Sequence, residues 1–307
     1  MVTKNTVPTL RPAPAPIDGR GQKRYNQIYI KGVFSMNVIL PALIVVLALC
    51  GLTVFLIAPG KAGKRMKAPF YGRNIAHRGL HKEDQSIPEN SLAAFRLAAE
   101  NGYGIELDVQ LTADNEVVVF HDDTLERVCG LEGKLSDFSW GELRSLRLCG
   151  TNERIPLLSE VFEAVGQRVP VIVELKRGPR NELLCKKTLA IMDRCRPTVC
   201  IESFDPFIVR WFWKNAPDIL RGQLSSQRED LEPGSGKLGA FCLSHLLSNF
   251  LCRPQFIAYR IGKKPLTVRL SEAMGAMKVL WTSKNWESES LADAVIFEHY
   301  RPRRKFK

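Results

Sequence analysis

Two carboxylates stand on one side of an otherwise apolar segment, GIELDVQL, at residues 104–111. Side chains alternate along a β-strand, so Glu106 and Asp108 face one way while the apolar residues between them face the other. Two like charges about 7 Å apart and partly withdrawn from water repel each other, and one of them tends to stay protonated. A bound cation would remove this repulsion, so the pair indicates a candidate metal site.

A second segment, VIVELK at residues 171–176, repeats the pattern and brings Glu174 and Lys176 to its own end. If both segments are strands of a parallel barrel, this end is the carboxyl end, where the active sites of such barrels lie. Three carboxylates without a thiolate or imidazole cluster favour an oxygen-binding divalent ion, Ca²⁺ or Mg²⁺, over zinc. An exposed position on an edge strand is the alternative for any single acid, and it fits the two segments together poorly.

Two histidines stand where a predicted strand gives way to a loop, His77 in IAHRG and His121 in VVVFHD. A single histidine there is more often structural, but a pair beside a metal can act as general acid and base near neutral pH. Arg78 and Lys176 add positive charge suited to an anionic oxygen, and arginine can bind phosphate through two hydrogen bonds. The combination is typical of phosphoester hydrolysis, and the sequence leaves open which histidine is the acid.

Other polar residues nearby are expected to have structural roles. Glu89 and Asn90 are interpreted as shaping a loop, with Asn90 as a candidate N-cap of the helix that follows. His81 is interpreted as a surface residue near the mouth of the site, and His245 and His299 are assigned no role.

The elements that must position these residues alternate between strand and helix from about residue 72 to residue 300. Strands are predicted at 73–77, 104–111, 117–121, 171–176, 199–204, 220–224, 256–260, 279–282 and 294–297. Helices are predicted at 90–101, 158–166, 181–193, 206–215, 238–251 and 268–277. Repeated β–α units over this length favour a (β/α)8 barrel, the TIM-barrel fold. The second and third predicted strands are too close in sequence for a helix to connect them as parallel neighbours. One of the nine is therefore either an extra hairpin strand or not a strand, and the predicted barrel is irregular.

The net charge of +12 is concentrated at the ends of the chain. Residues 1–69 hold ten Lys and Arg against a single Asp, and residues 301–307 hold five more, which leaves −2 on residues 70–300. A nucleic-acid-binding domain carries its basic charge on the folded body, so no nucleic acid partner is expected. Basic ends point instead to a membrane surface.

An uncharged window from residue 32 to 60 contains the apolar run VILPALIVVLALCGLTVFLIA at residues 38–58. A helix needs about 20 apolar residues to cross a bilayer. A cleaved signal peptide is the alternative, but a long segment precedes the run and no A-x-A site follows it. The predicted organisation is a flexible basic arm at 1–31, a single transmembrane helix at 32–60, a basic linker at 61–71, the barrel at 72–300 and a basic tail at 301–307.

The positive-inside rule supports the two possible sides of the membrane for the barrel almost equally. Six Lys and Arg precede the helix and six follow it within about 20 residues. Besides Cys50 in the helix, seven cysteines without a C-x-x-C pair suit a reducing compartment slightly better. The cytoplasmic side is therefore slightly favoured.

The order of the motifs resembles that of glycerophosphodiester phosphodiesterases over about residues 72–300. The matching segments are AHRG (76–79), PEN (88–90), GIELDVQLT (104–112), VVVFHDDTLERV (117–128), IPLLSEVF (155–162), VELK (173–176), ESFDP (202–206) and WTSKN (281–285). The resemblance implies an irregular TIM barrel that hydrolyses glycerophosphodiesters to an alcohol and sn-glycerol 3-phosphate.

The resemblance also implies roles for single residues. Glu106, Asp108 and Glu174 match the metal ligands, and His77 and His121 match the acid/base pair. Arg78 and Lys176 match the residues that hold the phosphate. Trp281 is a candidate apolar wall for the glycerol, with a place in the core as the equal alternative.

Some positions depart from the family pattern. Val128 and Cys129 replace a pair of threonines, and WTSKN and FEHYRP replace W-T-V-N and a final T-D-x-P. These changes bear on the substrate rim, so a lysophospholipase-D or phospholipase-D-like enzyme on lipid substrates is an alternative. A non-catalytic relative that binds head groups is a further alternative, but it would be expected to lack a histidine or carboxylate of the site.

Overall fold

A computed structural model describes residues 19–231 and 235–307, which form two compact units that divide between Leu52 and Thr53. Helix α1 (Gly19–Ile57) begins within the predicted flexible arm, so residues 19–31 are helical, and residues 1–18 lie outside the described residues. Among the described residues, one helix is long and apolar enough to cross a membrane, over 20 residues from Val38 to Ile57 with a mean hydropathy of 2.8.

The second unit contains a closed barrel of eight parallel strands, as predicted. In order around the barrel they are β1 (Arg73–Ala76), β9 (Ala294–Phe297), β8 (Met277–Ser283), β7 (Phe256–Arg260), β6 (Leu220–Ser225), β5 (Val199–Ser203), β4 (Val171–Leu175) and β2 (Gly104–Leu111). Pairing of β1 with β2, Ile75 opposite Gly104, closes the ring. The ninth strand, β3 (Val117–Val119), pairs antiparallel with β2 outside the ring, so the predicted extra strand is a hairpin strand.

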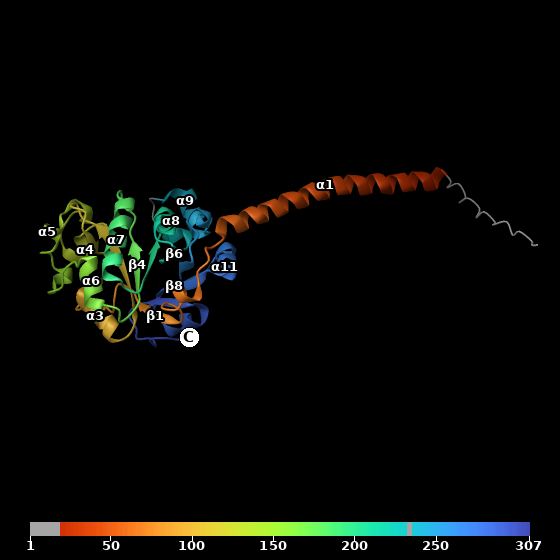
Figure 1. Ribbon diagram of the computed structural model, residues 1–307. Helices are drawn as coiled ribbons and strands as arrows, with labels where there is room; N and C mark the ends of the chain where they lie inside the picture. Colours follow the sequence, from red (N-terminus) through yellow and green to blue (C-terminus); the bar gives the residue numbers. More distant parts are fainter. Residues whose placement is uncertain (1–18, 232–234) are drawn as a thin grey trace, which may run out of the picture. The chain divides into compact units, whose positions relative to one another are not determined.

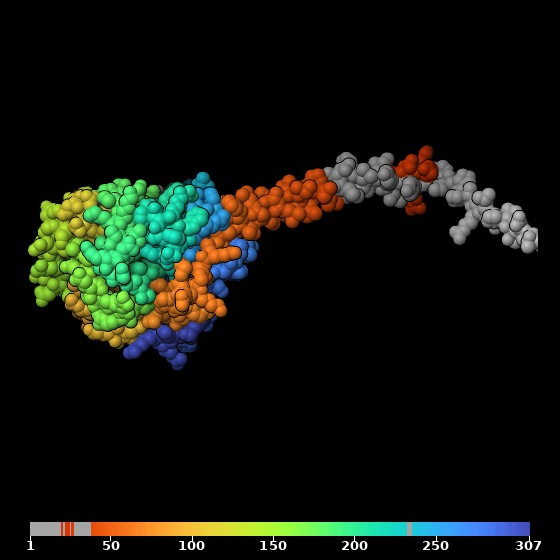
Figure 2. Space-filling view, viewed as in Figure 1, coloured from red at the N-terminus to blue at the C-terminus, as the bar shows by residue number. Residues whose placement is uncertain are grey.

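Helices cover the outside of the barrel (Figure 1). The longer ones are α3 (Leu92–Glu100), α6 (Leu158–Val165), α7 (Asn181–Cys195), α8 (Pro206–Asn215), α9 (Gly236–Ser244) and α11 (Leu266–Ala273). The predicted helix 238–251 is interrupted: after α9 the chain turns at Leu246, whose φ is +58°, and continues as α10 (Asn249–Cys252). Figure 2 shows α7 and α8, in green and teal, side by side on one face of this unit.

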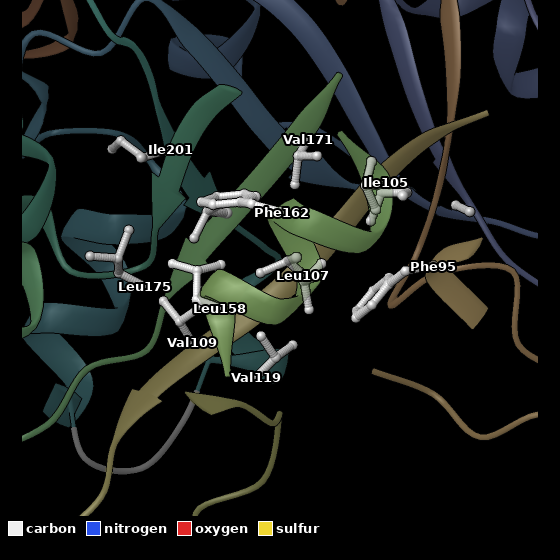
Figure 3. Close-up of a cluster of buried hydrophobic side chains, with 14 of the residues drawn as sticks. Phe95, Ile105, Leu107, Val109, Val119, Leu158, Phe162, Val171, Leu175 and Ile201 are labelled. Atoms are coloured by element: carbon white, nitrogen blue, oxygen red, sulfur yellow. The ribbon is translucent and has the colours of Figure 1, made fainter. Parts of the chain in front are cut away.

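The apolar side of β2 packs outward, as its alternation predicts. Ile105, Leu107 and Val109 are fully buried in one cluster with side chains of α3, α6 and β4. Helix α6 contributes Leu158, Val161, Phe162 and Val165, which lie on one face at spacings of three and four residues. Figure 3 shows Leu158 and Phe162 among the side chains of this cluster. The inward side of β2 is thereby left to the two carboxylates.

Between β3 and β4 lies an excursion with its own small core. It contains α4 (Glu126–Cys129), α5 (Trp140–Leu143) and the 3₁₀ turns Leu135–Asp137 and Leu148–Gly150. Phe120, Leu125 and Val128 are buried in it. This core fixes the chain directly after β3, where His121 lies.

The segments on either side of the barrel are attached to it. The predicted linker 61–71 includes α2 (Lys64–Lys67) and Phe70, which is buried against the barrel strands. The basic tail 301–307 runs along β1, where Lys305 forms an isolated antiparallel backbone β-bridge with Arg73. The Tyr103 hydroxyl donates to the Pro302 carbonyl at 2.6 Å. All eight cysteines lie in the described residues and are free thiols.

Candidate active site

The three predicted metal ligands meet inside the barrel. Glu106 and Asp108 point inward from β2, and Glu174 of β4 stands opposite Asp108 in the strand register. One oxygen from each carboxylate lies within 4.8 Å of the others, and all three residues are buried. Burial and then the neighbouring Asp108 hold the pKa of Glu106 well above its usual range, and burial raises the pKa of Glu174. Ionisation of Glu106 and Glu174 is therefore unfavourable in this buried cluster.

A tight turn after β1 places His77 and Arg78 beside these carboxylates. Arg78 has a positive φ of 53° and Gly79 one of 80°, and a Cβ on Gly79 would lie 2.9 Å from Cβ of Ala94. The turn points the Arg78 amide at Glu106, to which it donates at 3.0 Å. Nε2 of His77 lies 4.0 Å from the same carboxylate oxygen. The glycine of the H-R-G segment is thus required by backbone conformation and by the close approach of α3.

The two predicted phosphate-binding cations flank Asp108. Nε of Arg78 lies 3.6 Å from one Asp108 oxygen and Nζ of Lys176 lies 3.6 Å from the other. Lys176 also contacts Glu174 at 3.1 Å. Burial opposes charge on Lys176, but Glu174 and Asp108 outweigh it and raise the pKa of the ammonium. Both cations therefore remain charged at the edge of the acidic cluster.

Glu298, which follows β9, was not identified from the sequence. Its Oε1 lies 3.2 Å from Nδ1 of His77 and 3.2 Å from Nε2 of His81, and its other oxygen lies 3.5 Å from Nε2 of His299. Burial raises the pKa of Glu298, but the hydrogen bonds from His77 and His81 outweigh it and hold this pKa well below its usual range. Burial lowers the pKa of His77.

The contacts of Glu298 correct the sequence-based interpretation of two histidines, His81 and His299. His81 is 7% exposed and hydrogen-bonded, so it is not a surface residue. His299 is in contact with an acidic group and lies edge-on to the His81 ring, with centroids 5.1 Å apart. The only local signal was the glutamate beside His299 in FEHYRP.

The second predicted acid/base residue, His121, is held by a chain of ion pairs. Nδ1 of His121 lies 2.7 Å from Asp122, and Arg127 donates to Asp122 at 2.6 Å. Arg127 also donates to both oxygens of Glu89, which in turn accepts from Arg78 at 2.8 Å. Burial would raise the pKa of Glu89, but its two arginine partners lower it to about 2. The two strand-end turns are therefore linked through Glu89.

Asn90 does not cap α3, contrary to expectation. Ser91 is the N-cap, and its hydroxyl accepts from the amide of Ala94 at 3.1 Å. Asn90 has a positive φ of 53° and donates from Nδ2 to Asp108 at 2.9 Å. The P-E-N segment is thus part of the site, since Glu89 and Asn90 both bond to its charged residues.

A fourth carboxylate, Glu202 of β5, stands beside Glu174 in the strand register. It is 1% exposed, and among the described residues no donor lies within hydrogen-bonding distance of its Oε2. Burial, and then Glu174 and Asp108, hold its pKa well above the usual range. The alternation of ESFDP contained the signal, because Glu202 falls on the same side of its strand as Glu174 does on β4.

These side chains line one cavity of about 800 Å³. Seven of the eight residues predicted for the site line this cavity: His77, Arg78, Glu106, His121, Glu174, Lys176 and Trp281. The eighth, Asp108, is 1% exposed and lies within the acidic cluster. Trp281 is half-buried, donates from Nε1 to the carbonyl of Ala258 at 3.1 Å, and meets Phe204 edge-on. It is therefore both packed and at the cavity wall.

Carboxylates, histidines and cations gathered at the carboxyl ends of barrel strands define the class of (β/α)8-barrel proteins with a charged pocket at the catalytic edge. The model of the Glycerophosphoryl diester phosphodiesterase family matches residues 77–299. The chain belongs to this family.

Known proteins that are similar to this chain agree with that assignment. A glycerophosphodiester phosphodiesterase of Caldanaerobacter subterraneus subsp. tengcongensis is 38% identical over 49% of this chain and 65% of the relative. Lysophospholipase D GDPD1 of Homo sapiens is 35% identical over 43% of this chain and 44% of the relative. The matched segments thus span about half to two thirds of these relatives.

A solved structure is similar over more of the chain. An Oleispira antarctica phosphodiesterase in complex with the product sn-glycerol-3-phosphate has a TM-score of 0.60 and 26% sequence identity. The match covers 75% of this chain and 94% of that chain.

Proposed function

We propose that this chain hydrolyses glycerophosphodiesters to an alcohol and sn-glycerol 3-phosphate. The observation that carries the proposal is the meeting of three carboxylates, two histidines and two cations around one cavity. The related Oleispira antarctica structure, described as a complex with sn-glycerol-3-phosphate as product, supports this substrate class.

The acidic cluster fits one divalent cation. Glu106, Asp108 and Glu174 offer only oxygen ligands, which Ca²⁺ and Mg²⁺ prefer, and they lie close enough to bind a single ion. Burial, and after it the neighbouring Asp108, raise the pKa of both Glu106 and Glu174, and a bound cation would favour their ionised forms. When bound there, it would polarise a phosphoryl oxygen and the attacking hydroxyl.

The remaining charged and titratable residues of the site would bind the phosphate and transfer protons. Arg78 and Lys176 present positive charge to the phosphate from the edge of the acidic cluster. His77 and His121 are each engaged through Nδ1, by Glu298 and Asp122 respectively, so Nε2 is the nitrogen of each that exchanges a proton. One removes the proton from the attacking glycerol 2-hydroxyl or water, and the other protonates the leaving alkoxide.

Release of sn-glycerol 3-phosphate from glycerophosphocholine tests this function. We expect release that is abolished by EDTA and restored by Ca²⁺ or Mg²⁺. The variant His121→Ala should lose most of the activity, whereas His245→Ala, outside the cavity, should keep it. Activity insensitive both to EDTA and to His121→Ala would rule out the proposed site.

A second candidate is hydrolysis of lysophospholipids, as the name of the human relative suggests. One wall of the cavity is apolar, with Phe204, Phe207, Leu224, Leu243 and Trp281. Its volume of about 800 Å³ lies toward the upper end of the roughly 300–1,000 Å³ of small-molecule sites. This leaves room beyond a glycerophosphate for part of an acyl chain.

Phe207 separates the two candidates. It lines the cavity and is 64% exposed at the start of α8, whereas Trp213 of the same helix is exposed but does not line the cavity. If acyl chains bind there, Phe207→Ser should raise KM for lysophosphatidylcholine and leave glycerophosphocholine turnover unchanged, with Trp213→Ser as the matched control. Absence of choline release from lysophosphatidylcholine by the unaltered chain would exclude this candidate.

We also propose that the span Val38–Ile57 anchors the protein in a membrane as a single pass, with the barrel as its catalytic domain. The apolar composition of the span and the basic residues on both sides of it support the proposal. The cytoplasmic side is slightly favoured, so protease added to intact cells should leave the barrel uncut. Digestion of the barrel under those conditions would place it on the opposite side.

A further inference from the structure

The end of the apolar span is fixed to the barrel. Thr53–Ile57, the last residues of α1, belong to the barrel unit, and Ile57 is fully buried. Nη1 of Arg253 donates to the carbonyls of Phe55 and Ala58 at 2.9 and 3.0 Å, and Asn249 donates to the carbonyl of Ile57 at 3.2 Å. Two carbonyls of the last helical turn, those of Phe55 and Ile57, thus accept hydrogen bonds from α10 and from the residue after it.

The same asparagine connects this point to α11. Nδ2 of Asn249 also lies 3.5 Å from the hydroxyl of Ser271, which is buried on the inner face of α11. Just past the same, carboxyl-terminal end of α11, Nζ of Lys67 donates to the carbonyl of Gly275 at 3.0 Å. The carboxyl-terminal end of α11 is therefore bonded both to Asn249, which holds the end of the span, and to the basic segment that follows the span. Figure 1 shows α11, in blue, beside this orange segment.

The outer face of α11 carries an apolar stripe. Leu266, Leu270 and Met274 follow one another at spacings of four residues, so they lie along one line of the helix. They are 69%, 40% and 40% exposed. Three large apolar side chains in a row on one helix face mark an interaction surface more often than three scattered ones do.

The surroundings of the α11 stripe match a lipid surface. Residues 58–72 contain Lys61, Lys64, Arg65 and Lys67 and no acidic residue, and the first three of these are exposed. Phe250 of α10 is 36% exposed, and its ring centroid lies 5.9 Å from that of Phe55 in the span. Apolar side chains with flanking basic residues are the pattern of segments that lie in a membrane interface.

We propose that the α11 stripe lies against the surface of the same bilayer that the span crosses. The proposal rests on the anchoring proposed above, because a span ending at Ile57 puts the membrane interface at the residue that Asn249 holds. Helix α11 runs from the carboxyl end of β7 back to the amino end of β8, along the outside of the barrel. A bilayer along the stripe would therefore reach the rim on which the cavity opens, and a lipid substrate would enter without crossing bulk water.

Photo-crosslinking of the full chain tests the contact. The chain is reconstituted into nanodiscs of phosphatidylcholine and phosphatidylglycerol, with p-benzoylphenylalanine placed at position 270 or, as a control, at position 131. Leu131 is similarly exposed, at 37%, but lies in the excursion between β3 and β4. Mass spectrometry of the irradiated protein measures the yield of lipid adducts at each position.

We expect several-fold more lipid adduct at position 270 than at position 131. No adduct at position 270, or equal yields at both positions, would overturn the proposed contact while leaving the anchor intact. Extraction of the chain from membranes by alkaline carbonate would overturn the anchor and the contact together. Hydrolysis of glycerophosphocholine by the same samples reports separately on the proposed enzymatic function.

Discussion

The carboxylate of Glu298 lies 3.2 Å from Nδ1 of His77, across the junction where β9 meets β1. The pKa of Glu298 is held well below its usual range, so the ionised carboxylate accepts and Nδ1 of His77 donates. This fixes the tautomer of His77 and leaves Nε2 facing Glu106 at 4.0 Å. The acid/base chemistry proposed for His77 thus depends on a residue at the far end of the chain.

The variant Glu298→Gln should have a kcat/KM about tenfold lower than that of the unaltered chain. This is the lower end of the loss expected when the hydrogen-bonding partner that orients a site residue is removed. The carboxylate raises the pKa of His77, so its loss should lower that pKa further and move the corresponding limb of the pH–rate profile to lower pH. The measurement is kcat/KM for glycerophosphocholine across pH. His245→Asn, at the residue that follows α9, should change neither quantity. An unshifted profile in Glu298→Gln would contradict the role proposed for Glu298.

Metal removal should lower stability as well as activity. A cation bound to Glu106, Asp108 and Glu174 stabilises the folded state by about 2.7 kcal/mol at a concentration of 100 Kd. We expect the Tm to rise on addition of Ca²⁺ or Mg²⁺ after EDTA treatment, and Glu106→Gln to lose this rise. The exposed Glu132→Gln should retain it. An equal rise in all three proteins would show that the ion binds elsewhere.

Glu89 should make stability depend on pH between about 4.5 and about 2. Its folded pKa of about 2 lies below the ordinary 4.5, so its contribution is present above pH 4.5 and is lost as pH falls toward 2. The full contribution is about 3 kcal/mol as an upper limit. Urea unfolding in EDTA should show Glu89→Gln less stable than the unaltered chain at pH 6, with the gap narrowing toward pH 3. A constant gap would contradict the pairing of Glu89 with Arg78 and Arg127, and Glu132→Gln is the control.

The turn that carries His77 should not tolerate a side chain at position 79. Gly79 has a φ of +80°, and an added Cβ would meet both Cβ and the carbonyl carbon of Ala94 at 2.9 and 3.0 Å. Gly79→Ala should therefore destabilise the fold by roughly 1–3 kcal/mol. Gly63→Ala has open space around its Cβ and a negative φ, so it should change stability little. Thermal unfolding of the two variants makes the comparison, and equal Tm values would refute it.

Local patterns in the sequence were sufficient for the fold and for part of the site. Alternation in GIELDVQL and VIVELK separates the inward carboxylates from outward residues such as Leu107, and the barrel confirms this separation. Nine segments were predicted as strands, and all nine are strands. The order of short motifs was specific enough to indicate the family that the comparisons establish.

Turn conformations were less predictable. Asn90 is of a residue type that is common at N-caps, but the hydroxyl of Ser91 takes that role and the Asn90 side-chain amide donates to Asp108. A cap and a site residue look alike in sequence, because both are short polar side chains before an apolar run. Only the direction of the side chain relative to β2 distinguishes them.

Spacings within a few residues were enough to predict which strands carry carboxylates, which loops carry histidines and where an apolar span precedes them. The partners of those residues, in contrast, are set by long-range packing. Glu298 lies 221 positions from His77, and Arg127 lies 38 from Glu89. Closure of the barrel through β1 and its neighbours brings the first pair together, and the excursion after β3 brings the second. Such contacts follow from how distant segments pack, which no local periodicity records.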